Sequence, residues 1–263
     1  MARWAEFDWG GESGAANELP PGFVEVFAAS MPPRYRVLFD PRATRRHAAV
    51  SYRRGARPAN AEVWRTHADG SAALCVVADD RPGLLSAIAA ALVFHRLDVI
   101  TALVFSRPVD GGAVEAVDLV WVRRANAEDD VSIGDDEAAS VGEVLAAILS
   151  GHLAVEQIAA RATAAPGDDD EVVVRLEEVD EEGLAGLFVE AADRPGMLLT
   201  IAFEVFQHGA QIVRSLVRTA AGRAYNHFEL AEFSGAPLSV ERREQIRDAV
   251  YAALTLRDVQ GHM

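Results

Sequence analysis

Apolar and polar positions along the chain fall into two blocks that have the same order. Each block begins with an apolar run that ends in Asp-Arg-Pro-Gly, at "ADDRPGLL" (78–85) and at "AADRPGML" (191–198). Behind each segment, apolar residues recur at helical spacing, which predicts an amphipathic helix followed by a strand rich in branched residues. The blocks align without a gap from Ala78–Ser106 to Ala191–Thr219, which indicates an internal duplication.

The second part of each block predicts a hairpin and a closing helix. A glycine-containing turn leads into a third apolar strand, over 113–122 in the first copy and 224–233 in the second. The closing helices have apolar stripes formed by Val141, Val144, Leu145, Ile148 and Leu149, and by Ile246, Ala249, Val250 and Leu254. Each copy therefore reads β-α-β-β-α and needs a fourth strand. We assign 171–179 to the first copy, and only 255–259 remains for the second.

This order predicts the α+β fold class, with two ferredoxin-like βαββαβ domains whose antiparallel sheets each carry two helices on one face. The predicted domains are 71–180 and 181–263. Residues 1–70 form a leader and an arginine-rich helical segment. Within it, apolar spacing predicts a helix in 21–30, and Asp40-Pro41 is a typical helix start for 40–54.

The charge is uneven along the chain. The net charge is −15, which argues against a general affinity for nucleic acid or an anionic membrane. Between residues 30 and 66, however, nine arginines face only Asp40 and Glu62. One interpretation is a nucleic-acid patch, but no aromatic or glycine-rich recognition motif accompanies it. We favour docking of this segment onto the acidic remainder of the chain, or simple solvation, and expect no nucleic-acid partner.

Composition excludes several chemistries. All 25 basic residues are arginine, so Schiff-base chemistry on lysine, pyridoxal-phosphate attachment and a P-loop lysine are excluded. Cys75 is the only cysteine; it permits no intrachain disulfide and fits a strand in the core. No apolar run reaches membrane length, and the first residues lack the apolar run of a secretion signal. We therefore expect a cytoplasmic protein without a membrane partner.

A strand, then Asp-Arg-Pro-Gly, then an apolar helix, then a strand that opens with a polar residue ("LDVITA", "AQIVRS") resembles the ACT domain, a small regulatory module. Two copies behind "MPPRYRVLFDPRATRRHA" resemble the C-terminal region of the bifunctional uridylyltransferase/uridylyl-removing enzymes, which modify the PII nitrogen-signalling protein. The resemblance covers roughly residues 23–254. It implies a regulatory protein of nitrogen or amino-acid metabolism that binds a small amino acid, with glutamine favoured.

The resemblance also implies where a ligand would bind. Unpaired N–H groups at the start of each helix attract a carboxylate, and a glycine there lets a ligand come close. The polar residue that opens the next strand would accept from the ammonium; many ACT domains have Asn there, whereas this chain has Asp98 and Gln211. The expected ligand-binding residues are Asp80, Arg81, Pro82, Gly83, Leu84, Leu85 and Asp98 in the first copy, and Asp193, Arg194, Pro195, Gly196, Met197, Leu198 and Gln211 in the second. We favour the first copy, because Asp98 is charged.

Alternatives stay open at this point. The Asp-Arg-Pro-Gly loops could be structural turns in which Asp80 and Asp193 cap the helices. The chain could be a protein interaction module that regulates an enzyme or signalling protein without a ligand, or a remnant of the uridylyltransferase. Gly70-Ser71 lacks the paired aspartates of a nucleotidyltransferase, and no histidine is followed by aspartate as in the family's hydrolase domain. We therefore expect no catalysis, no cofactor and no metal.

Assembly is the last expectation. Two sheets in one chain leave edge strands whose N–H and C=O groups need partners, so we expect the two copies to pack together with their helices on one face. We also expect a homodimer, with the apolar side of the third strand, at Val117, Leu119 and Trp121, available for such a contact.

Overall fold

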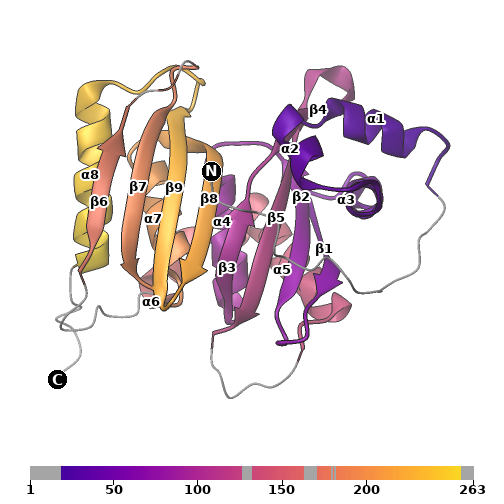
Figure 1. Ribbon diagram of the computed structural model, residues 1–263, viewed down its shortest axis with the longest axis horizontal. Coiled ribbons are helices and arrows are strands. Elements are labelled where there is room, and N and C mark those ends of the chain that lie inside the picture. The colour runs from indigo at the N-terminus through magenta and orange to yellow at the C-terminus, as the bar shows by residue number, and fades with distance from the viewer. Residues whose placement is uncertain (1–18, 126–131, 163–170, 179, 181, 256–263) are drawn as a thin grey trace.

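A computed structural model describes residues 19–125, 132–162, 171–178, 180 and 182–255. Within these residues the strands form one open antiparallel sheet in the order β1-β2-β5-β3-β8-β9-β7-β6, with β4 added beside β5 (Figure 1). The strands are β1 (Ala59–Thr66), β2 (Ala72–Asp79), β3 (Leu97–Leu103), β4 (Ser106–Pro108), β5 (Val114–Arg124), β6 (Val173–Glu177), β7 (Ala185–Ala192), β8 (Ala210–Ala220) and β9 (Arg223–Glu232). The α+β class is therefore confirmed.

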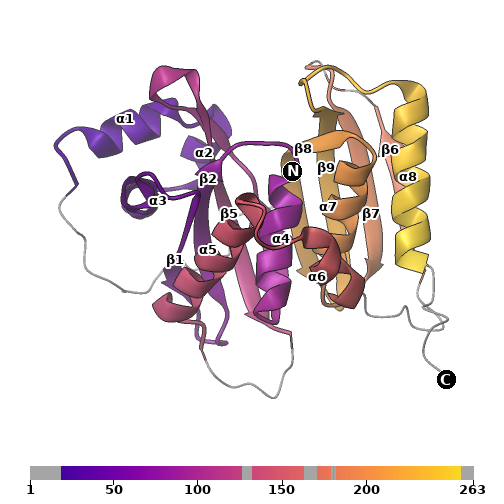
Figure 2. The same ribbon diagram turned by 180° about the vertical axis from the view of Figure 1, so that it is seen from behind.

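Helices cover the sheet unequally. One face carries α4, α5, α6, α7 and α8, whereas the opposite face is covered by α1, α2 and α3 over its first half only (Figures 1 and 2). The helices are α1 (Phe23–Ser30), α2 (Pro33–Leu38), α3 (Pro41–Arg54), α4 (Leu84–Phe94), α5 (Asp135–Leu149), α6 (Val155–Ala162), α7 (Met197–Gln207) and α8 (Val240–Thr255), with a short 3₁₀ turn, η1 (Asp110–Gly112), in the β4–β5 hairpin. Sequence patterns predicted neither α2 nor α6.

The two halves of the sheet have the same element order, β-β-α-β-β-α, which runs β1-β2-α4-β3-β5-α5 and then β6-β7-α7-β8-β9-α8. The assignment of 171–179 to the first copy is wrong, because β6 pairs with β7 from Val173↔Glu190 to Glu177↔Gly186. The first copy's edge strand is instead β1, which pairs with β2 although it lies in the predicted leader. Of the proposed last strand at 255–259, Thr255 belongs to α8 and the rest lies outside the described residues.

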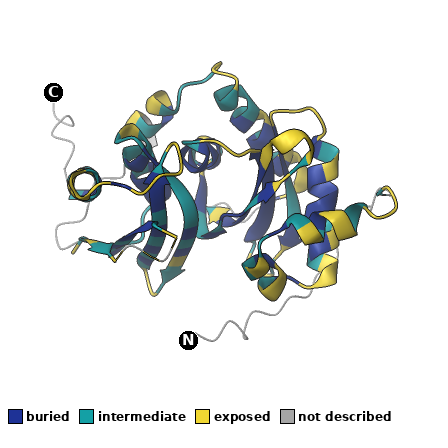
Figure 3. Ribbon diagram, turned by 90° about the horizontal axis from the view of Figure 1, so that it is seen from above, coloured by how far each residue is buried: buried dark blue, intermediate teal, exposed yellow. Residues whose placement is uncertain are grey.

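The two halves pack together with their helices on one face, as expected, and their sheets join edge to edge (Figures 1 and 2). Strand β3 pairs with β8 through Thr101↔Arg218, Ala102↔Val217 and Leu103↔Leu216, so the sheet continues from one half to the other. Helices α4 and α7 pack together above this junction, and one apolar core runs beneath all five helices of that face. Figure 3 shows the buried residues along the strands of both halves and on the helices packed against them.

The N-terminal helices have their own core on the other face of the first half. Phe27, Tyr35 and Phe39 pack there against β5, which is the predicted third strand of the first copy. Val117 and Leu119 on that strand are fully buried, and Trp121 is also buried. The expectation that this apolar side is free for a second chain is therefore wrong, because α1, α2 and α3 of the same chain already cover it.

Arginines fasten the same segment to the sheet. Arg53 forms a two-pronged ion pair with Glu62 of β1, and Arg46 donates to the Trp64 carbonyl. Arg54 bridges Asp79 and the buried Glu115, at 2.5 and 3.2 Å. Docking of the arginine-rich segment onto acidic groups of the chain is confirmed for Arg53 and Arg54.

Candidate functional site

The two Asp-Arg-Pro-Gly loops have nearly identical backbones. Gly83 and Gly196 immediately precede α4 and α7 with φ of +81° and +80°, a left-handed conformation in which glycine is strongly favoured. The Asp80 N–H donates to the Val114 carbonyl at 2.9 Å, and that of Asp193 donates to the Gly222 carbonyl at 2.8 Å. Neither aspartate side chain caps its helix, so that alternative is wrong in this detail.

The arginines of the loops have a structural role. Arg81 donates to the Leu149 carbonyl at the end of α5, at 2.6 Å, and Arg194 donates to the Leu254 carbonyl near the end of α8, at 2.5 Å. A cation at a helix C-terminus satisfies a carbonyl without an intrahelical partner and interacts favourably with the helix dipole. Each loop is thereby tied to the closing helix of its own half.

Each loop faces a strand of the other half. Because β8 runs antiparallel to β3, the start of β8 lies at the end of the sheet where β2 meets its loop. The start of β3 lies correspondingly beside the second loop. The expected grouping of Asp98 with the first loop and of Gln211 with the second is therefore wrong: the structure exchanges them between the two clefts described next.

The first cleft, called here the Gly83 cleft, has a volume of about 20 Å³. Residues of both halves line it. The first half contributes Asp80, Arg81, Gly83, Leu84, Leu85, Ser86, Val104, Ala116 and Asp118, and the second half contributes Ala202, Val205, Phe206, Ala210, Gln211 and Ile212. The second cleft, the Gly196 cleft, also measures about 20 Å³. It is lined by Asp193, Arg194, Gly196, Met197, Leu198, Leu199, Val217, Thr219, Ala224 and Asn226, with Ala89, Val93, Leu97, Asp98 and Val99 from the first half.

A buried carboxylate points into the Gly83 cleft from the middle of β5. Asp118 is 1 % exposed, and its Oδ1 atom has no hydrogen-bond partner among the described residues. Burial, reinforced by the nearby Asp80 carboxylate, raises the pKa of Asp118 well above its usual range, although the Phe105 backbone opposes this. An unpaired buried carboxylate is costly, so a partner that supplies a donor or a cation would bind there favourably.

An aromatic ring closes the Gly83 cleft. Phe206 of α7 lies so near Gly83 that a Cβ atom on the glycine would come within 2.8 Å of its ring. The ring also stacks on Phe233, at 5.4 Å between centroids. Since Phe233 is 44 % exposed, this pair lies at the surface and the ring has solvent beside it.

The Gly196 cleft differs in its polar groups. Asn226 occupies the place of Asp118, because Asn226 pairs with Val189 as Asp118 pairs with Val76 in the other half. Arg123 bridges Asp98 at 2.9 Å and Asp193 at 2.5 Å, which links the two halves. Burial is the largest influence on Asp98 and raises its pKa, despite the hydrogen bond from Arg123.

The remaining predicted site residues are mostly core. Leu84, Leu85, Met197 and Leu198 are buried at the starts of α4 and α7, each at one wall of its cleft. Pro82 is half-buried and Pro195 is exposed, and neither lines a cleft. Gln211 donates through Nε2 to the Glu232 carbonyl at 2.9 Å, so its side-chain oxygen and the second hydrogen on Nε2 are the groups it can offer to a ligand.

Sequence reasoning missed Asp118, Phe206 and Arg123. The signal for Asp118 was present, since it is the acidic residue in the apolar run "AVDLVWV" and shares a side of the strand with buried Ala116 and Val120. Phe206 and Arg123 carry no such signal, because their roles depend on the pairing of the two halves.

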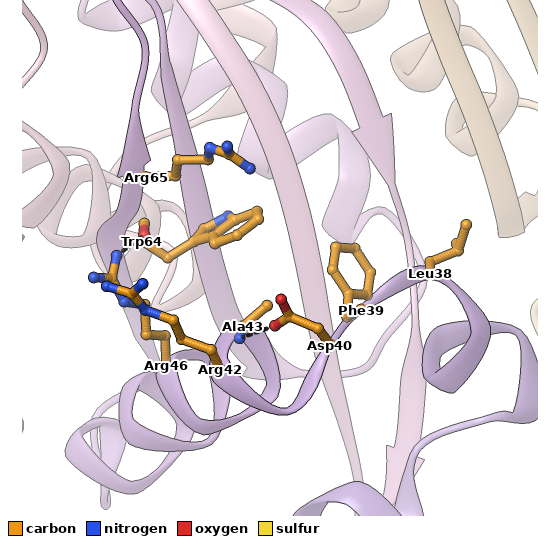
Figure 4. A pocket seen from close by; sticks show the side chains of 8 residues that line it. All are labelled: Leu38, Phe39, Asp40, Arg42, Ala43, Arg46, Trp64 and Arg65. Carbon is orange, nitrogen blue, oxygen red and sulfur yellow. Dashed lines mark hydrogen bonds between the residues drawn. The ribbon is translucent and has the colours of Figure 1, made fainter. Parts of the chain in front are cut away.

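A third cavity, of about 100 Å³, lies between α3 and β1 (Figure 4). Arg42, Arg46 and Arg65 surround Trp64 there, while Asp40 accepts a hydrogen bond from the Ala43 N–H at 2.7 Å and so caps α3. Arg46 donates a hydrogen bond to the Trp64 carbonyl, so this cavity belongs to the contact between α3 and β1. Across the described part of the chain, no group of three or more His, Cys, Asp or Glu side chains is placed to hold a metal ion.

Fold and site together define an α+β protein with two similar halves and a matched pair of clefts at their junction. The chain is 25 % identical over 232 residues to the bifunctional uridylyltransferase/uridylyl-removing enzyme of Nitrobacter hamburgensis, which covers 84 % of this chain and 24 % of that protein. It is 25 % identical over 189 residues to the enzyme of the same name from Bradyrhizobium diazoefficiens, 71 % of this chain and 19 % of that protein. The chain thus spans a quarter or less of these relatives. No family model matches it, and no helix in the described ranges is long and apolar enough to cross a membrane.

Proposed function

We propose that this chain is a non-catalytic regulatory module that resembles tandem ACT domains and binds a small amino acid at the junction of its two halves. The observation that carries the proposal is the matched pair of clefts, in which the N-terminus of a helix from one half faces a polar residue from the other. The similarity to a region of the uridylyltransferase/uridylyl-removing enzymes supports a regulatory role in nitrogen metabolism. L-Glutamine is therefore the first candidate ligand.

The chemistry of a zwitterion fits such a cleft. The N–H groups at the start of α4 can hold the α-carboxylate, which gains about 0.3–1 kcal/mol from the helix dipole. A carboxylate or amide oxygen from the lining residues can then accept from the ammonium. Both ends of the ligand would contact groups that have few other partners.

Binding requires the cleft to open. A volume of about 20 Å³ accommodates about one water molecule, so an amino acid must displace a side chain such as Phe206. Because Phe206 belongs to α7 and covers Gly83 of the other half, its displacement alters the contact between the halves. Ligand binding would thereby change the junction, which is how a sensor passes on a signal.

A thermal-shift screen of the twenty amino acids tests this function. A ligand present at one hundred times its Kd stabilises the folded state by about 2.7 kcal/mol, which raises the Tm measurably. We expect L-glutamine to raise it and D-glutamine, the matched control, to have no effect. Absence of stabilisation by all twenty would contradict amino-acid binding, and robust uridylyl transfer to PII by the purified chain would contradict the non-catalytic role.

The alternative function is an interaction module without a ligand. It is favoured by the second half of the sheet, where no described helix covers the face that α1, α2 and α3 cover in the first half. Arg175 and Arg218 lie over the rings of Phe188 and Tyr225 on that face. If the screen finds no amino acid, this face becomes the leading candidate for a protein partner, including a second copy of the chain.

A further inference from the structure

Asp118 and Asn226 make the two clefts chemically unequal. They occupy equivalent places in β5 and β9, and both are at least 98 % buried. The amide of Asn226 is neutral and has a contact to the Met197 sulfur at 3.7 Å. Asp118 has a carboxylic acid where Asn226 has an amide, and its Oδ1 atom has no partner among the described residues.

The Gly83 cleft lacks a cation for its acids. Arg81 is the one basic side chain in its lining, and that guanidinium donates to the Leu149 carbonyl instead. Arg34 exerts an electrostatic attraction on Asp118, but its hydrogen bond goes to the Val104 carbonyl. Within the described part of the chain, no basic side chain is hydrogen-bonded to Asp80 or Asp118 in this cleft.

In the Gly196 cleft the chain supplies its own cation. The Arg123 guanidinium lies between the carboxylates of Asp98 and Asp193, whose side chains are only 8 and 9 % exposed. A ligand's ammonium would have to displace this guanidinium from both acids. The two acids of the second cleft are thus paired with a cation of the chain, and this pairing links the two halves.

We propose that the Gly83 cleft is the single ligand site of the chain and that Asp118 binds the ammonium group of the ligand. This inference rests on the proposed function. It restricts the ligand to molecules with a primary ammonium group, and it sets the stoichiometry at one ligand per chain. The helix N-terminus alone would accept any carboxylate. The buried acid beside it, whose Oδ1 atom has no partner among the described residues, selects for the amine.

The test compares three probes by calorimetry and thermal shift: L-glutamine, its desamino analogue 4-carbamoylbutanoate, and methylammonium chloride against sodium chloride. The variants are Asp118→Asn, which copies the residue of the other half and is expected to fold, and Asp110→Asn, the same change in the exposed η1 turn. We expect one glutamine per chain, no binding of the desamino analogue, at least a tenfold weaker affinity in Asp118→Asn, and unchanged affinity in Asp110→Asn.

The outcomes separate this inference from the proposed function. Equal glutamine affinity in the wild type and Asp118→Asn, or two glutamines per chain, overturns the inference while the function stands. If no amino acid binds but methylammonium stabilises the wild type and not Asp118→Asn, the ammonium site stands and amino-acid sensing is wrong. If neither amino acids nor methylammonium have an effect, both are overturned.

Discussion

Replacing Gly83 by alanine should lower the free energy of unfolding for two separate reasons. A side chain at φ +81° costs about 1–2 kcal/mol in the left-handed region. The new Cβ would also meet the Phe206 ring at 2.8 Å, and overpacking of this kind typically costs about 1–3 kcal/mol. We expect Gly83→Ala to lower the free energy of unfolding by about 2–5 kcal/mol.

A double-mutant cycle separates the two penalties. In a Phe206→Val background the ring is gone, as in the other half, where Val93 lines the equivalent cleft. Gly83→Ala should then cost only the backbone part, about 1–2 kcal/mol, so the two substitutions are coupled. Gly196→Ala is the matched control: it has the same backbone penalty and should show no coupling to Phe206.

Urea unfolding at neutral pH, followed by circular dichroism, measures all of these variants. The m-value should stay constant if only the stability changes. Equal costs of Gly83→Ala in both backgrounds would refute the reasoning, since it would mean that α7 of the second half does not contact the first loop.

Two further predictions follow from other contacts, and a third follows from the homodimer expected from the sequence. His47 is buried beside the Tyr35 hydroxyl at 2.6 Å, and burial lowers its pKa to about 3, below the unfolded value of 6.5. The free energy of unfolding should therefore fall as the pH drops through this window, by roughly 3 kcal/mol at pH 4.5. Urea titrations from pH 7 to 4 should show a flatter profile in a Tyr35→Phe/His47→Phe variant, and an unchanged slope would contradict a buried neutral imidazole. Arg123→Met should lower the free energy of unfolding in the same assay by about 1–3 kcal/mol. This is less than for a fully buried pair, because the Arg123 side chain is 44 % exposed. A negligible change would mean that the stability does not depend on this link between the halves. Light scattering should give twice the chain mass for this expected homodimer, whereas 28.3 kDa at micromolar concentration would contradict it.

Most helices and strands could be predicted from the sequence, but the partners of the edge strands could not. Apolar periodicity located α4 and α7, and the Asp40 cap located the start of α3. The strand that pairs with the outer edge of β2 could come from before or after β2 in the sequence. Periodicity alone cannot decide between 59–66 and 171–179. A local signal existed: Asp69-Gly70 between two apolar runs is typical of a hairpin, and it joins β1 to β2.

The site was predicted in its parts and not in its grouping. The loops at Gly83 and Gly196 lie at helix starts as the motif indicates, because only glycine takes that backbone without strain. Their partners depend on the β3–β8 pairing, which brings Gln211 to the first loop and Asp98 to the second. A pairing between two similar halves leaves no pattern within either half, so the sequence could not reveal the exchange.

The most direct test of the account is amide NMR of the isotope-labelled protein titrated with the amino acid that stabilises it most. If the ligand binds between the halves, the largest shift changes should fall on Gly83, Leu84 and Leu85 of one half together with Phe206 and Gln211 of the other. Changes confined to one half, or to α1, α2 and α3, would contradict a ligand site built from both repeats.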